Sequence, residues 1–137
     1  MHIAVLEHIY QAPGPEKVAR LNAGVKASVF AALAASISLS SGMLAEQLGL
    51  SARTLRNRAT KGRSALLTAD ETERSFRVYR VLRRATEVIG NEEAAKDWMK
   101  TPQKALGRKT PLSLLSRDLG TEEVLNLLTG IEQGGVM

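Results

Sequence analysis

The residues with the clearest chemical potential are three arginines in the segment LGLSARTLRNRATKG, Leu48 to Gly62. Arg53, Arg56 and Arg58 fall within two to three turns of any helix that contains them. A guanidinium group can donate two hydrogen bonds to the edge of a guanine or pair with a phosphate. The spacing therefore favours DNA recognition, although a basic helix can also be a solvated face with no ligand.

The elements that would position these arginines have the pattern of a helix-turn-helix. Ala45 is small enough for a close helix crossing, Gly49 follows four residues later, and Leu55 comes six residues after that. Leu44, Leu48 and Leu50 supply apolar contacts, and Ser51 is predicted to cap the second helix. The sequence thus predicts a tight turn at Gly49 followed by a basic helix.

The second helix of this motif is predicted to carry the DNA contacts. Arg53, Arg56 and Asn57 should face away from Leu55 towards base edges, and Arg58 and Lys61 should meet the DNA backbone. A helix-turn-helix of this size usually reads DNA as a dimer, so we expect a homodimer on two half-sites. The predicted DNA-binding residues are Ser51, Arg53, Thr54, Arg56, Asn57, Arg58 and Lys61.

The distribution of charge supports the same interpretation. Residues 1–67 hold eight Lys/Arg and three Asp/Glu, whereas residues 68–137 hold eleven of each, so the whole surplus of +5 lies in the first half. This asymmetry is expected if the first half of the chain binds a polyanion such as DNA and the second half does not.

The rest of the chain is predicted to be helical, which makes the fold class all-α. Residues 1–15 form an arm whose structure the sequence does not decide: it could be a short helix, a strand paired with another chain, or loosely ordered chain. After it, residues 26–37 have the apolar spacing of a buried helix, and Thr68 with Glu71 forms a capping box. Further helix starts are predicted at Pro15, Ser40 or Ser41, Asn91, Thr101-Pro102, Thr110-Pro111 and Thr121.

Composition argues against several function classes. The chain has no cysteine, and its two histidines lie in the arm, so we expect no metal, no cofactor and no enzymatic activity. The apolar stretch from Val25 to Leu39 is interrupted by Lys26 and serines and is too short to span a membrane. With no signal peptide pattern at the start, we expect a cytoplasmic protein.

The order of motifs in the second half resembles the C-terminal domain of the MbcA/ParS/Xre antitoxin family. The matching features are Glu73-Arg74 at the start of a long helix, Gly90 at its end, and Trp98 in an Ala-x-x-Trp element, followed by Pro102, "ALG", "TPL", Gly120, Val124 and "IEQG". "LGLSARTLRNR" is similar to the helix-turn-helix of that family. One departure is Arg108, where the family often has a second glycine, so we expect the loop to bend differently there.

The resemblance implies three segments and a function. Residues 1–15 would be the arm, 16–67 an Xre-like helix-turn-helix domain and 68–137 a toxin-binding helical domain. The implied function is that of a type II antitoxin that blocks a RES-domain, NAD-consuming toxin and represses its own operon. The candidate toxin contacts are Arg108, Lys109, Glu132, Gly134, Gly135, Val136 and Met137.

Alternatives remain open at the level of sequence. The residues after Ile131 suggest a short tail that could enter a cleft, or an ordinary frayed terminus. Trp98 is expected in the core, and the arginines at 74, 77, 80 and 84 are expected to form a solvated stripe paired with Glu71, Glu73 and Glu87. As a whole, the chain could instead be a stand-alone regulator whose second half dimerises or senses a ligand, or a helical adaptor with no DNA role.

Overall fold

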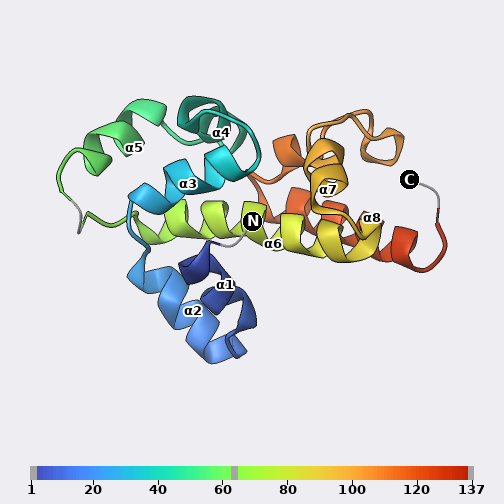
Figure 1. The fold of residues 1–137 in the computed structure, drawn as a ribbon, viewed down its shortest axis with the longest axis horizontal. Coiled ribbons are helices and arrows are strands. Elements are labelled where there is room, and N and C mark those ends of the chain that lie inside the picture. Colours follow the sequence, from blue (N-terminus) through green and yellow to red (C-terminus); the bar gives the residue numbers. More distant parts are fainter. Residues whose placement is uncertain (1–2, 63–64, 136–137) are drawn as a thin grey trace. The chain divides into compact units, whose positions relative to one another are not determined.

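Helices make up the regular structure of residues 3–62 and 65–135, which the computed structural model describes (Figure 1). No strand forms within those ranges; there are only two isolated bridges, between Lys26 and Leu66 and between Gln103 and Lys109. The all-α prediction is therefore confirmed. The α-helices are α1 Ala4–Gln11, α2 Gly14–Ala23, α3 Ser28–Ser36, α4 Ser41–Gln47, α5 Ala52–Ala59, α6 Ala69–Ile89, α7 Glu92–Met99 and α8 Asp118–Glu132, and two short 3₁₀ helices are η1 Lys104–Leu106 and η2 Leu112–Leu114.

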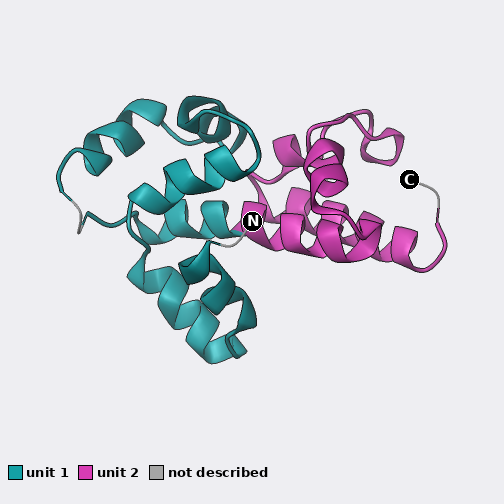
Figure 2. Cartoon of the chain, in the orientation of Figure 1, with its two compact units in different colours: residues 1–76 teal, residues 77–137 magenta. Residues whose placement is uncertain are grey.

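The chain divides into two compact units, residues 1–76 and residues 77–137 (Figure 2). The long helix α6 contributes residues 69–76 to the first unit and its remaining residues to the second.

Predicted capping residues begin several of the helices. The side chains of Ser40, Ser51 and Asn91 accept hydrogen bonds from backbone N–H groups three residues later, at 3.1, 3.1 and 2.9 Å. The capping box of α6 is also present, because Thr68 N–H donates to Glu71 Oε1 at 2.8 Å and Glu71 N–H donates to Thr68 Oγ1 at 3.1 Å. These interactions satisfy backbone donors that the first turn of a helix leaves free.

The arm at the start of the first unit contains α1, which is the short-helix alternative of the sequence analysis. Leu6 and Ile9 of this helix are buried. No described helix is by itself long and apolar enough to cross a membrane; α3 and α4 reach that criterion only together, across a bend of 89°. The buried apolar residues of the unit include Leu6, Ile9, Phe30, Leu33, Ile37, Leu44, Leu48, Leu55 and Leu67.

The core of the second unit forms between α6, α7 and α8. Trp98 is only 5% exposed, so its assignment to the core is confirmed, although its Nε1–H has no hydrogen-bond partner among the described residues. Other buried apolar residues of this unit are Val78, Tyr79, Val81, Leu82, Ala85, Met99, Leu112, Leu115, Val124 and Leu128.

The start of the last helix was predicted wrongly. Thr121 does not begin it, because α8 starts at Asp118 and the Thr121 hydroxyl donates back to the carbonyl of Arg117 at 2.9 Å. Asp118 instead occupies the first turn, where the helix dipole favours a carboxylate, and it pairs with Arg77 of α6. This pairing joins residues far apart in sequence, so local patterns did not reveal it.

Neither of the two Thr-Pro pairs begins an α-helix, contrary to the prediction. The hydroxyl of Thr101 donates to the carbonyl of Asp97 at 2.6 Å, which places it at the end of α7 and not at a helix start. Thr110 Oγ1 accepts a hydrogen bond from the N–H of Ser113 at 3.2 Å, but the helix that follows, η2, is a single 3₁₀ turn with Pro111 at its N-cap position. The chain between α7 and α8 is therefore mostly loop.

Candidate functional site

The turn between α4 and α5 has the predicted geometry. Gly49 has a φ of 69°, a conformation that glycine adopts with little strain. Its N–H donates to the carbonyl of Glu46 at 3.2 Å, and the N–H of Leu50 donates to the carbonyl of Ala45 at 2.9 Å. Ala45 is fully buried and Leu55 is 6% exposed, so the small residue and the leucine lie in the core as expected.

The outer face of α5 presents polar side chains to solvent. Arg53, Arg56 and Asn57 are exposed and share one side of the helix, because they are three and four residues apart. Within the described residues, neither of these two arginine side chains has a hydrogen-bond or ion-pair partner. Ser51, Thr54 and Lys61 are also exposed, with Ser51 serving as the cap. These side chains are free to meet a ligand.

Arg58 is placed differently from the other predicted DNA contacts. Its guanidinium group pairs with Glu71, and the side chains of the two residues are only 24% and 10% exposed. Burial by itself would raise the pKa of Glu71, but hydrogen bonds from the Arg58 side chain and the Thr68 backbone N–H hold that pKa below its usual value. Arg58 therefore links the last turn of α5 to the capping box of α6.

Arg84 of α6 pairs with Glu87 at 3.8 Å, as expected, but the arginines of this helix also bind groups that were not predicted from sequence. Arg74 donates to the carbonyl of Leu48 at 2.8 Å, next to the Gly49 turn, and it also pairs with Asp70. In the second unit, Arg77 pairs with Asp118. An i,i+4 spacing could have indicated the Asp70 pair, whereas the Asp118 pair depends on the tertiary fold.

Two of the predicted toxin contacts lie in the loop after η1. Arg108 and Lys109 are exposed, and the N–H of Arg108 donates to the carbonyl of Gln103 at 2.9 Å. Arg108 has a φ of 65° and directly follows Gly107, whose φ is 66°. The arginine therefore adopts the left-handed backbone conformation that a glycine would favour at this position.

The other predicted toxin contacts lie at the end of α8. Glu132 forms two hydrogen bonds with Arg84, at 2.8 and 2.7 Å, and these bonds lower the pKa of the carboxyl. Gly134 has a φ of 98°, and the N–H of Gly135 donates to the carbonyl of Gly130 at 2.8 Å. These two glycines close the helix rather than extending from it. Val136 and Met137 lie outside the described residues.

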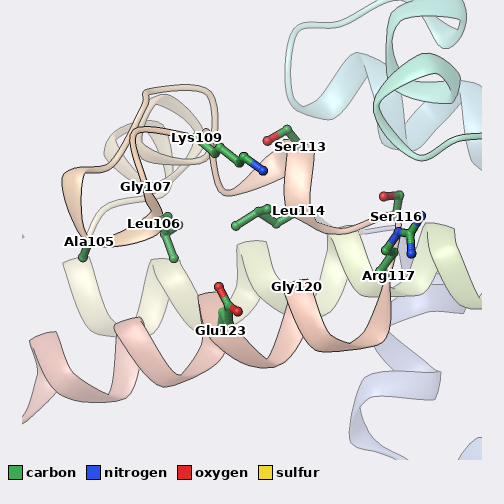
Figure 3. A pocket seen from close by; sticks show the side chains of 10 residues that line it. All are labelled: Ala105, Leu106, Gly107, Lys109, Ser113, Leu114, Ser116, Arg117, Gly120 and Glu123. Carbon is green, nitrogen blue, oxygen red and sulfur yellow. The ribbon is translucent and has the colours of Figure 1, made fainter.

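A groove in the second unit was not anticipated from sequence. It has a volume of about 560 Å³ and is formed by η1, the following loop, η2 and the first turns of α8 (Figure 3). Gly120 permits the close approach of α8 to η2, because a Cβ atom there would lie 2.2 Å from the carbonyl oxygen of Leu114. The lining includes Leu106, Lys109, Ser113, Leu114, Arg117 and Glu123.

Two protein-family models match the chain, and together they cover most of both units. A family model described as the antitoxin Xre-like helix-turn-helix domain matches residues 16–80. Another, described as the antitoxin Xre/MbcA/ParS C-terminal toxin-binding domain, matches residues 84–134.

Similar curated proteins carry the name Antitoxin Xre. The protein of this name from Photorhabdus laumondii is 32% identical over 123 residues, which cover 88% of this chain and 81% of that protein. Its namesake from Yersinia enterocolitica is 37% identical over 63% of this chain and 57% of its own length. For the one from Pseudomonas putida, identity is 33% over 60% of this chain and 50% of that protein. The similarity to the first of these extends over most of both chains.

Proposed function

Because this chain belongs to the Xre/MbcA/ParS antitoxin family, we propose that it blocks a RES-domain, NAD-consuming toxin and represses its own operon. The observation that carries the proposal is the presence, in one chain, of a helix-turn-helix with a free basic face and a domain similar to the toxin-binding domains of the family. In this proposal the chain acts by binding, without catalysis, in the cytoplasm where operator DNA lies.

The DNA-binding surface of the proposal is the outer face of α5. Arg53, Arg56 and Asn57 would reach base edges in the major groove, and Lys61 would meet the phosphate backbone. Ser51 and Thr54, at the start of the helix, would lie near a phosphate, which helix N-termini attract. A homodimer would read two half-sites, and a bidentate arginine–guanine contact contributes about 1–3 kcal/mol to discrimination between bases.

Operator binding tests this surface. We expect Arg53→Ala and Arg56→Ala each to weaken binding to the chain's own promoter DNA at least tenfold and to reduce the salt dependence of binding. Arg80→Ala is a matched control, because Arg80 is an exposed arginine of the second unit and the substitution removes the same charge. If the α5 variants bind like the control, the recognition surface is misassigned.

Toxin neutralisation tests the other half of the proposal. The purified chain, added to the RES-type toxin of the same operon, should form a stable complex and stop NAD consumption. A toxin that keeps consuming NAD, or a purified pair that never associates, would contradict the antitoxin function.

The proposal includes toxin contacts in two segments of the second unit. Arg108 and Lys109 lie in the loop after η1, and Glu132 to Gly135 lie at the end of α8. Deleting residues 134–137 tests the C-terminal contact: unchanged neutralisation would show that the end of the chain is not part of the interface.

A further inference from the structure

Positive charge is concentrated in one segment of the second unit. Residues 98–117 contain five Lys/Arg and no Asp/Glu, although residues 68–137 as a whole are neutral. This segment builds most of the groove between η1, η2 and α8. The five cations are Lys100, Lys104, Arg108, Lys109 and Arg117.

Charged side chains of the groove are free to bind a partner. Within the described residues, the side chains of Lys109, Arg117 and Glu123 have no hydrogen-bond or ion-pair partner, unlike the arginines at 77 and 84. Figure 3 shows Leu106, Leu114 and Glu123 pointing into the space between α8 and the loop, with Lys109 extending towards η2. The groove therefore combines two unpaired cations with one carboxylate and apolar side chains.

The groove is built on a defined backbone. Gly107 turns the loop with a φ of 66°, and Gly120 brings α8 against η2 with no space for a side chain between them. Leu112 and Leu115, at the two ends of η2, are buried and hold this short helix in the core. The groove has a volume of about 560 Å³, which lies in the range of clefts that bind small ligands, and it is open to solvent along one side.

We propose that this groove receives an acidic, partly apolar segment of the toxin, with Lys109 and Arg117 pairing with its carboxylates. The inference rests on the toxin-binding function proposed above and extends the predicted contact at Lys109 to a surface that includes α8. The Glu123 carboxylate would accept hydrogen bonds from backbone N–H groups of the bound segment, and so would the Ser113 hydroxyl, which already donates its proton to the Thr110 carbonyl at 2.8 Å.

The lining favours a protein segment over nucleic acid. Leu106 and Leu114 match apolar side chains of a peptide rather than a sugar-phosphate backbone, which offers no apolar group at this position. Leu119, in the first turn of α8, is 73% exposed and adds apolar surface to the same helix. Aliphatic surface beside unpaired cations is typical of a protein interface that selects an acidic partner.

Charge reversal tests the inference with a matched control. Lys109→Glu/Arg117→Glu reverses both groove cations, whereas Arg80→Glu/Lys104→Glu makes the same change in net charge at exposed residues that do not line the groove. Affinity for the purified toxin of the operon is measured for the wild-type chain and both variants. Circular dichroism verifies that each variant is folded.

We expect the groove variant to bind the toxin at least tenfold more weakly than the control variant, with less dependence on salt. Equal toxin affinity of the two variants would overturn the groove inference and leave the antitoxin function standing. A wild-type chain that does not bind the toxin would instead overturn the proposed function, and the groove inference with it. A groove variant that loses operator affinity selectively, with normal toxin binding, would assign the groove to DNA and refute the inference.

A second variant tests whether the groove must be empty for the toxin to bind. Ala105 is exposed and lines the groove, so Ala105→Trp should fill it without burying a new group in the core. Toxin affinity should fall at least fivefold while operator binding is unchanged. Full toxin affinity of this folded variant would show that the groove is not occupied in the complex.

Discussion

Glu71→Gln tests whether one carboxylate both caps α6 and holds the end of α5. Glutamine can keep the capping hydrogen bond with the backbone N–H of Thr68, because Glu and Gln both serve in a capping box. It removes the negative charge that faces Arg58, whose side chain is 24% exposed. The substitution therefore isolates the ionic part of the interaction from the cap.

The size of the effect follows from this partial burial. A hydrogen bond to a charged group contributes about 1.5–3 kcal/mol, whereas an exposed ion pair contributes about 0–1 kcal/mol. With one partner nearly buried and the other partly exposed, we expect Glu71→Gln to lower the free energy of unfolding by about 1–2 kcal/mol. Each kcal/mol corresponds to about 4–8 °C in the melting temperature of a domain with 60–100 residues.

Thermal and urea unfolding measure this loss, with Glu46→Gln as the control. Glu46 is exposed on α4 and its carboxylate has no partner within the described residues, so its substitution should change stability by less than about 0.5 kcal/mol. A double-mutant cycle with Arg58→Met should give a coupling energy of about 1 kcal/mol between residues 58 and 71. A coupling below about 0.3 kcal/mol would refute the proposed link between α5 and α6.

The effect should also depend on pH. The pKa of Glu71 is lowered in the folded protein, so its carboxylate stabilises the fold above the unfolded pKa of about 4.3. This contribution is lost as the pH falls through the lower, folded pKa. The stability difference between wild type and Glu71→Gln should therefore be complete above about pH 5 and shrink in more acidic solution.

The same variants decide the role of Arg58. If Arg58 holds α5 through Glu71, Arg58→Met lowers stability and leaves the salt dependence of operator binding unchanged. If Arg58 instead pairs with a DNA phosphate, as the sequence alone suggested, removing that one pairing makes the slope of log K against log salt shallower by about 0.9.

Three further substitutions test local geometry, each measured by thermal unfolding. Gly120→Ala should destabilise the second unit by at least about 2 kcal/mol, because its Cβ would lie 2.2 Å from the carbonyl oxygen of Leu114. Gly130→Ala is the control, because Gly130 lies in the same helix with open space around the new methyl group. It should stabilise the unit by about 0.5–1 kcal/mol. Similar effects at the two glycines would contradict the close packing of α8 against η2. Arg108→Gly should stabilise the protein by about 0.5–1 kcal/mol, because it removes the strain of a non-glycine residue at a φ of 65°. A loss of stability would mean that contacts of the arginine side chain outweigh this backbone strain. Ser51→Ala should destabilise by about 1 kcal/mol, and an unchanged melting temperature would refute its role as the cap of α5.

The sequence by itself determined the features that depend on nearby residues. Ser51, Asn91 and the Thr68–Glu71 box were identified as caps because each acts across three residues. The turn at Gly49 was predicted for the same reason, since glycine and the flanking leucines describe it locally. These signals were sufficient to predict an all-α chain with a helix-turn-helix.

Only the tertiary structure decided which charges are already paired and where the groove lies. Arg58 was predicted to face DNA, yet its partner Glu71 is thirteen residues away, and Arg84 pairs with Glu132 across forty-eight residues. The groove likewise depends on α8 approaching η2 at Gly120. A charge pattern in sequence shows which side chains can bind, but burial and chain packing determine which of them remain free to do so.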